Sequence, residues 1–86
     1  MKVIYKYAIS KGEIQVLKCS KILCVQLQNN KPHVWILVDT EEKEFETRQF
    51  RIVGTGEHFD DKDMKYICTY QHDIFVWHVF EKTERI

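Results

Sequence analysis

The stretch "KYICTYQHDIFVWHVFEK", residues 65–82, decides the fold class of this chain. A period of two dominates both of its halves, as in a β-strand whose alternate side chains face opposite sides of a sheet. His72 and Asp73 separate the halves and predict a tight hairpin turn. The C-terminal part of the chain is therefore expected to form two antiparallel strands, 65–71 and 74–82.

The same period extends back to the N-terminus. Val3, Tyr5, Tyr7 and Ile9 alternate with more polar residues, and further strands are expected at 14–17, 21–28, 33–39 and 45–53. The segment "NNKP", 29–32, predicts a hairpin, because asparagine tolerates positive φ and proline fixes its own. No segment shows helical spacing of apolar residues over three turns, and "DDKDMKYI", 60–67, predicts one helical turn at most.

The segment "FETRQFRIV", 45–53, changes its parity partway along. Phe45 and Val53 share one parity, whereas Phe50 and Ile52 share the other. A β-bulge supplies the extra residue that returns apolar side chains to the same face. We therefore expect a bulge between Phe45 and Phe50.

These elements predict an all-β fold of about seven short antiparallel strands, arranged as a compact sandwich or a partly open barrel. A chain of 86 residues has room for one domain, residues 1–86, and folding then buries about 60% of the unfolded surface. Residues 83–86 are expected to fray.

Charge and composition narrow the functional classes. Lysine plus arginine and aspartate plus glutamate number 13 each, so no net charge draws the chain to nucleic acid or to a membrane. The N-terminal "MKVIYKYAIS" lacks the pattern of a signal peptide, and the longest apolar run, "VWILV", is far shorter than the roughly 20 residues that span a bilayer. The three cysteines have no CxxC spacing. A cytosolic protein without a membrane partner is expected.

The stretch "RIVGTGEHFDDKD", 51–63, is the first candidate site. A phosphate site would use its glycines for close approach and Arg51 for a bidentate contact. It lacks the third glycine of the dinucleotide fingerprint, however, and Glu57 would repel the anion. A metal site would use Glu57, His58 and the aspartates, whose spacing fits neither calcium nor zinc. A solvated acidic turn with glycines at positive φ is favoured, and no metal or cofactor is expected.

Catalytic motifs are absent from the sequence, which contains neither a GxSxG elbow nor an HExxH helix. His78 lies on an apolar strand face, where a hydrogen-bonded core or interface histidine is favoured over a general base. Cys24 or Cys68 would pair with His78 only if the fold brought them together. We predict a protein that is not an enzyme, with a small hydrolase based on His78 and a cysteine as the enzymatic alternative.

Aromatic residues make up 13% of the chain. They could stack single-stranded nucleic acid, but alternation places most of them with Val, Ile and Leu, so a core role is favoured and nucleic acid is not an expected partner. Trp35 and Trp77 lie in strands with apolar residues on both faces, which predicts one core face and one interface, as in a homodimer. A groove rimmed by Arg51, Thr55 and His58 would then hold a small anion.

Six pieces of the sequence carry a family resemblance: "IYKY" at 4–7, "ILCVQLQN" at 22–29, "VWILVD" at 34–39, "FRIVGTG" at 50–56, "YICTYQ" at 66–71 and "VWHVFE" at 76–81. In this order the chain resembles a family of small proteins of unassigned function encoded by bacteriophages and prophages. "FRIVGTG" followed by "VWHVFE" is the most specific combination. The chain departs from the family pattern at Cys68, where glycine is expected, and at Glu57, where a small residue or histidine is expected.

The resemblance implies a biological setting without implying a reaction. Small phage proteins outside the virion and the replication machinery often counter host defence. We therefore expect a non-enzymatic protein in the cytoplasm of the infected bacterium that binds a defence protein, such as a CRISPR effector, or sequesters a nucleotide signal. A phage structural or regulatory protein that acts only through self-association or protein docking is the alternative. The residues expected to bind the ligand or partner are Arg51, Thr55, Glu57, His58, Trp35, Trp77 and His78.

Overall fold

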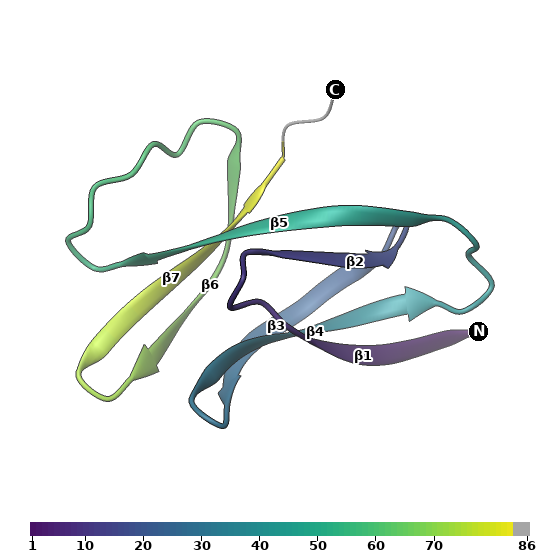
Figure 1. Ribbon diagram of the computed structural model, residues 1–86, viewed down its shortest axis with the longest axis horizontal. Coiled ribbons are helices and arrows are strands. Elements are labelled where there is room, and N and C mark those ends of the chain that lie inside the picture. The colour runs from purple at the N-terminus through teal and green to yellow at the C-terminus, as the bar shows by residue number, and fades with distance from the viewer. Residues whose placement is uncertain (84–86) are drawn as a thin grey trace.

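The computed structural model describes residues 1–83, which form seven strands (Figure 1). The strands are β1 (Lys2–Ala8), β2 (Glu13–Leu17), β3 (Lys21–Gln28), β4 (Lys31–Asp39), β5 (Phe45–Gly54), β6 (Met64–His72) and β7 (Phe75–Lys82). These residues form no helix, and so none that could cross a membrane. The sequence predicted that residues 83–86 fray. Residues 84–86 lie outside the described chain, whereas Thr83 is held by a hydrogen bond from its N–H to the Asp63 carbonyl at 2.8 Å.

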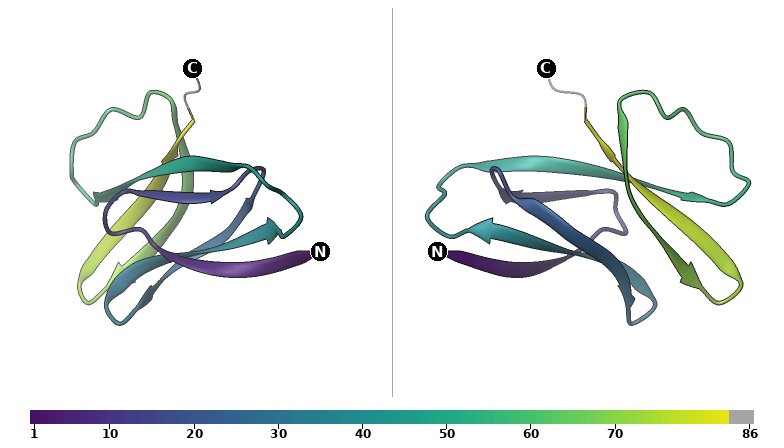
Figure 2. Two further views of the ribbon diagram at one scale, coloured as in Figure 1. Left: turned by 45° about the vertical axis from the view of Figure 1, so that its right-hand side comes forward. Right: turned by 180° about the vertical axis from the view of Figure 1, so that it is seen from behind.

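The strands make two antiparallel sheets and no closed barrel. A three-stranded sheet has the order β1-β4-β3, and a four-stranded sheet has the order β2-β5-β7-β6 (Figures 1 and 2). Strand β5 joins two partners, because residues 45–49 pair with β2 and residues 50–54 pair with β7. The prediction of seven antiparallel strands without a long helix is confirmed.

The core lies between the two sheets and consists mainly of β-branched side chains. Such residues pack well on a pleated surface, and fully burying one contributes about 1.5–3 kcal/mol. Val34, Ile36 and Val38 of β4 alternate with outward-facing residues, and all three are completely buried. The other members of the core are Ile9, Ile14, Val16, Val25, Phe50 and Val79.

Two-residue turns close two of the hairpins. Asn29 (φ 54°) and Asn30 (φ 63°) join β3 to β4, which is the backbone of a type I′ turn and confirms the predicted hairpin. Between β6 and β7 the turn residues are Asp73 (φ 57°) and Ile74. This second turn begins one residue later than the sequence predicted, because His72 still pairs with Phe75.

The expected bulge in β5 is wrong. The pairing of β5 is continuous, and the shifts in register occur instead between Ile22 and Cys24 of β3 and between Tyr66 and Cys68 of β6. The parity argument failed because it placed Phe45 in the core, whereas Phe45 is 65% exposed. Polar residues of β5 take the inward positions instead.

One of these inward residues is Arg48, which forms an ion pair with Glu81 of β7. Its Nε and Nη2 donate to the two carboxylate oxygens at 2.5 and 2.9 Å, and its Nη1 donates to the Ser20 carbonyl at 2.6 Å. Glu81 is only 4% exposed, and it is the buried charged residue of the described core. The pair joins the neighbouring strands β5 and β7, and Arg48 also reaches the Ser20 carbonyl just before β3.

Candidate binding site

Several of the predicted site residues meet where β5 ends and β7 begins. A pocket of about 400 Å³ lies between the chain after β5 and the tip of the β6–β7 hairpin. We call it the hairpin-tip pocket, and its lining residues are Gly54, Thr55, Glu57, Ile74, Phe75, Val76 and Trp77. Thr55, Glu57 and Trp77 were predicted from the sequence, whereas the apolar tip residues Ile74 and Phe75 were not.

Gly54 and Gly56 shape this pocket in different ways. A Cβ atom on Gly54 would lie 3.1 Å from Cζ3 of Trp77, so the glycine allows the indole ring to lie against the backbone. Gly56 has a φ of 90° and no atom close to its Cβ position. The prediction of positive φ is therefore correct for Gly56 and wrong for Gly54, because Gly54 is still part of strand β5.

Arg51 and Glu57 form an ion pair at the rim of the pocket. The Arg51 Nη2 donates to Glu57 at 3.2 Å, and the Gly54 N–H donates to the other carboxylate oxygen at 2.9 Å. The backbone hydrogen bond from Gly54, followed by the Arg51 contacts, lowers the pKa of Glu57. The sequence suggested that Glu57 would repel an anion from this loop; in the structure its own carboxylate accepts the hydrogen bonds of Arg51 and Gly54.

His78 is the centre of a chain of hydrogen bonds on the outer face of the four-stranded sheet. Its Nε2 lies 2.8 Å from the Thr55 hydroxyl, and its Nδ1 lies 3.0 Å from the Thr69 hydroxyl. The Thr69 hydroxyl is in turn 2.7 Å from the Tyr66 hydroxyl. At the other end, Thr55 Oγ1 lies 3.2 Å from the Val76 carbonyl oxygen.

The Val76 carbonyl determines the direction of every bond in this chain. A carbonyl oxygen can only accept, so the single hydrogen of the Thr55 hydroxyl points to Val76. Thr55 must then accept from Nε2–H of His78, and Nδ1 accepts from Thr69, which accepts from Tyr66. This direction predicts the Nε2–H tautomer for neutral His78, with both ring nitrogens engaged.

The expected alternative of a cysteine–histidine pair is not supported by the geometry. Cys68 is paired with Val79 and packs against the core, whereas His78 is paired with Thr69 on the opposite face of the sheet. Neighbouring residues of a strand point to opposite faces, so the Cys68 thiol and the His78 ring are separated by the sheet. Among residues 1–83, no three histidine, cysteine or acidic side chains gather as a metal site.

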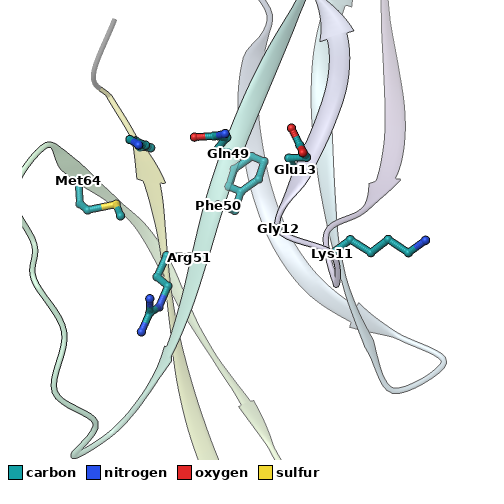
Figure 3. A pocket seen from close by; sticks show the side chains of 8 residues that line it. Lys11, Gly12, Glu13, Gln49, Phe50, Arg51 and Met64 are labelled. Carbon is teal, nitrogen blue, oxygen red and sulfur yellow. The ribbon is translucent and has the colours of Figure 1, made fainter.

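A second pocket near Arg51, of about 290 Å³, lies where β2 begins beside β5 (Figure 3). Its lining includes the cationic residues Lys11, Arg51 and Lys82. In Figure 3 the Lys11 side chain extends away from Phe50 and the pocket, and Arg51 points along the sheet, where it meets Glu57. Lys11 and Arg51 therefore do not converge on one position, as binding of a phosphate group by this pair would require.

One family model matches the whole sequence, residues 1–86, and its description is "Domain of unknown function (DUF7352)". The chain belongs to the DUF7352 family. No curated protein and no solved structure matches it. Membership of DUF7352 confirms one part of the resemblance seen in the sequence, namely that the chain belongs to a family of unknown function.

The remaining predicted site residues of this DUF7352 chain lie apart from the hairpin-tip pocket. Trp35 belongs to β4 of the other sheet, where its ring centroid is 6.3 Å from that of His33. His58 is exposed in the loop between β5 and β6. Sequence reasoning also missed Thr69 and Tyr66 as neighbours of His78. Pairing across the predicted turn at His72 and Asp73 would have placed Ile67 opposite His78. The observed turn at Asp73 and Ile74 shifts the register and places Thr69 there instead.

Proposed function

We propose that this chain is a non-enzymatic, phage-encoded binding protein that docks on a protein of a bacterial defence system, such as a CRISPR effector, in the cytoplasm of the infected cell. The docking part of the proposal is supported by the hairpin-tip pocket. The phage origin and the defence setting are supported by the resemblance of the six sequence pieces. Membership of DUF7352 adds neither a reaction nor a partner.

The observation that carries the docking proposal is the exposure of the hairpin tip. Ile74 is 85% exposed and Phe75 is 59% exposed, and the Phe75 ring lies 6.2 Å from that of Trp77. Large apolar side chains that gather beside a pocket are typical of the anchors in protein interfaces. Thr55 and Glu57 supply polar groups at the margin of the same pocket, as the rim of an interface does.

Nucleotide sequestration, the other form of the anti-defence hypothesis, has less support. A nucleotide needs cations directed at its phosphates, and Arg51 instead binds Glu57. The Gly54 N–H, which could also bind a phosphate oxygen, donates to the same carboxylate. A nucleotide would therefore have to displace Glu57 before it gained these contacts, which favours a protein partner.

The proposal is tested by measuring how well a restricted phage forms plaques on bacteria that carry a defence system and express the chain. We expect the wild-type chain to restore plaque formation, and the Ile74→Asp/Phe75→Asp variant to lose most of this effect. Both residues are exposed, so the changes remove interface anchors without affecting the core. Phe45→Asp is the control, because Phe45 is equally apolar and 65% exposed but lies at the far end of β5.

Three outcomes separate the parts of this proposal. If the wild-type chain protects phage from none of a panel of defence systems, the anti-defence function is wrong. If protection occurs and survives Ile74→Asp/Phe75→Asp, the function stands but the docking surface is elsewhere. If protection is lost equally in Phe45→Asp, the hairpin tip is not a specific docking site.

Self-association through the same tip is the second candidate function, because the exposed Ile74 and Phe75 would also fit a second copy of the chain. Light scattering coupled to gel filtration measures this directly. A dimer of the wild-type chain that becomes a monomer in Ile74→Asp/Phe75→Asp would support it. A wild-type monomer across micromolar concentrations would exclude it.

A further inference from the structure

A pocket larger than the two described above lies on a different part of the molecule, between the two sheets. Strands β3 and β6 are the edge strands of their sheets, and they contact each other (Figure 2, right). Between them is a cleft of about 440 Å³, within the range of sites that bind ligands. We call it the edge cleft, and its lining residues are Ser20, Lys21, Ile22, Leu23, Cys24, Arg48, Lys65, Tyr66, Ile67, Cys68 and Glu81.

The two β-bulges of the fold both occur at this cleft. The register shifts leave Leu23 of β3 and Ile67 of β6 without a partner in the sheet, and both residues line the cleft. A bulge bends a strand and ends regular pairing, and bulges are common beside functional sites. Leu23 is 44% exposed although it is a large apolar residue, so the cleft presents an uncovered apolar wall.

The backbone of β3 turns toward β6 next to the cleft. The two-residue turn makes Gln28 and Lys31 a hydrogen-bonded pair, and alternation along the ladder turns the Val25 N–H and C=O away from β4. The Val25 carbonyl accepts a weak hydrogen bond from the Cys68 thiol at 3.9 Å, and Val25 is buried, so β6 covers this part of the β3 edge and holds one end of the cleft in place.

The charges of the cleft are unbalanced. At its floor, Glu81 is neutralised by the bidentate contact with Arg48. Lys21 and Lys65 are exposed at its margin, and the side-chain ammonium group of neither forms an ion pair or hydrogen bond with any residue in the range 1–83. The cleft therefore combines apolar walls with two uncompensated positive charges.

We propose that the edge cleft binds an extended segment of a partner protein in which an apolar side chain is flanked by carboxylates. The apolar side chain would lie against Leu23 and Ile67, and the carboxylates would pair with Lys21 and Lys65. This site is separate from the hairpin-tip pocket and goes beyond the proposed function, because it specifies a second surface and the chemistry of its ligand.

The test uses a library of random heptapeptides selected for binding to the full-length chain. We expect the enriched peptides to carry acidic residues around a central apolar residue. Fluorescence anisotropy of one labelled peptide should show binding weakened on the order of tenfold in Lys21→Glu/Lys65→Glu, because each reversal replaces an attraction with a repulsion. Lys11→Glu/Lys31→Glu is the matched control, with the same change of charge outside the cleft, and should bind like the wild type.

A second measurement locates the bound peptide. Its addition should shift the amide NMR signals of Leu23 and Ile67, which line the cleft, and should leave that of Phe45 unchanged. Enriched peptides without acidic residues, or binding undiminished in Lys21→Glu/Lys65→Glu, would overturn the proposal. So would a cleft that binds decanoate or ATP but no peptide. The Ile74→Asp/Phe75→Asp variant should retain peptide binding, so failure at the hairpin tip and failure at the cleft are distinguishable.

Discussion

The guanidinium of Arg48 and the carboxylate of Glu81 form a bidentate ion pair between the two sheets, with donor–acceptor distances of 2.5 and 2.9 Å. The hydrogen bond to Glu81 raises the pKa of Arg48 further above its ordinary value. Removing one partner of a buried pair leaves an uncompensated charge, whereas replacing both with apolar residues often costs little. Both residues belong to neighbouring strands of the four-stranded sheet, so the pair offers a direct test of how a buried ion pair stabilises β5 and β7.

We predict that Glu81→Ala lowers the free energy of unfolding by about 3–5 kcal/mol. The double variant Arg48→Met/Glu81→Leu should recover most of this loss, because no buried charge is then left unpaired. Urea unfolding followed by fluorescence measures both values. A loss below about 1 kcal/mol in Glu81→Ala would show that water reaches the pair and that it behaves as a surface ion pair.

The contact between Gly54 and Trp77 predicts a local effect of Gly54→Ala. The new methyl group would lie 3.1 Å from the indole ring, so the ring must shift, at a cost of about 1–3 kcal/mol. The emission spectrum of Trp77, measured in a Trp35→Phe background, should change. Gly56→Ala is the control: its φ of 90° makes alanine strained by about 1–3 kcal/mol, but the Trp77 emission should stay the same.

The hydrogen-bond chain predicts the tautomer of His78. At a pH where the ring is neutral, ¹⁵N NMR should show the hydrogen on Nε2, because Thr55 accepts from Nε2 and donates to Val76. Thr55→Val should cancel this preference and cost about 0.5–1.5 kcal/mol of stability. Thr47→Val, whose hydroxyl bonds Gln15 instead, should leave the ring signals unchanged. An Nδ1–H tautomer in the wild type would contradict the assigned direction.

Burial raises the pKa of the Cys68 thiol above its ordinary value of 9.0, and the nearby Cys24 contributes in the same direction. At pH 8, iodoacetamide should therefore modify the exposed Cys19 first and Cys68 much more slowly, as mass spectrometry of digested samples would show. Equal rates at the two positions would mean that the cleft admits water freely.

The same raised pKa predicts how stability depends on pH. The folded state holds the Cys68 proton more tightly than the unfolded chain does, so this contribution is complete below the ordinary thiol pKa and is lost as pH rises through the folded-state value. Melting temperatures measured upward from pH 8 should fall more for the wild type than for Cys68→Ala. Burial also raises the pKa of Tyr7 and Tyr70, so both proteins should lose some stability.

The candidate site was only partly predictable. Thr55, Glu57 and Trp77 were chosen for their residue types, and the structure places them around one pocket. His58 and Trp35 were chosen on the same grounds, but neither lines that pocket. Residue type indicates what a side chain can bind, whereas convergence on one position depends on strand pairing, which the sequence pattern does not specify.

The sequence by itself determined the strands and most of their turns, because alternation of side chains and the backbone preferences of residues such as Asn29 and Asn30 act locally. The tertiary structure alone decided where the bulges fall, which face holds Phe45, and that Glu57 binds Arg51. It also decided that β3 and β6 become facing sheet edges. These features depend on contacts between segments far apart in the chain, whose energies no local pattern contains.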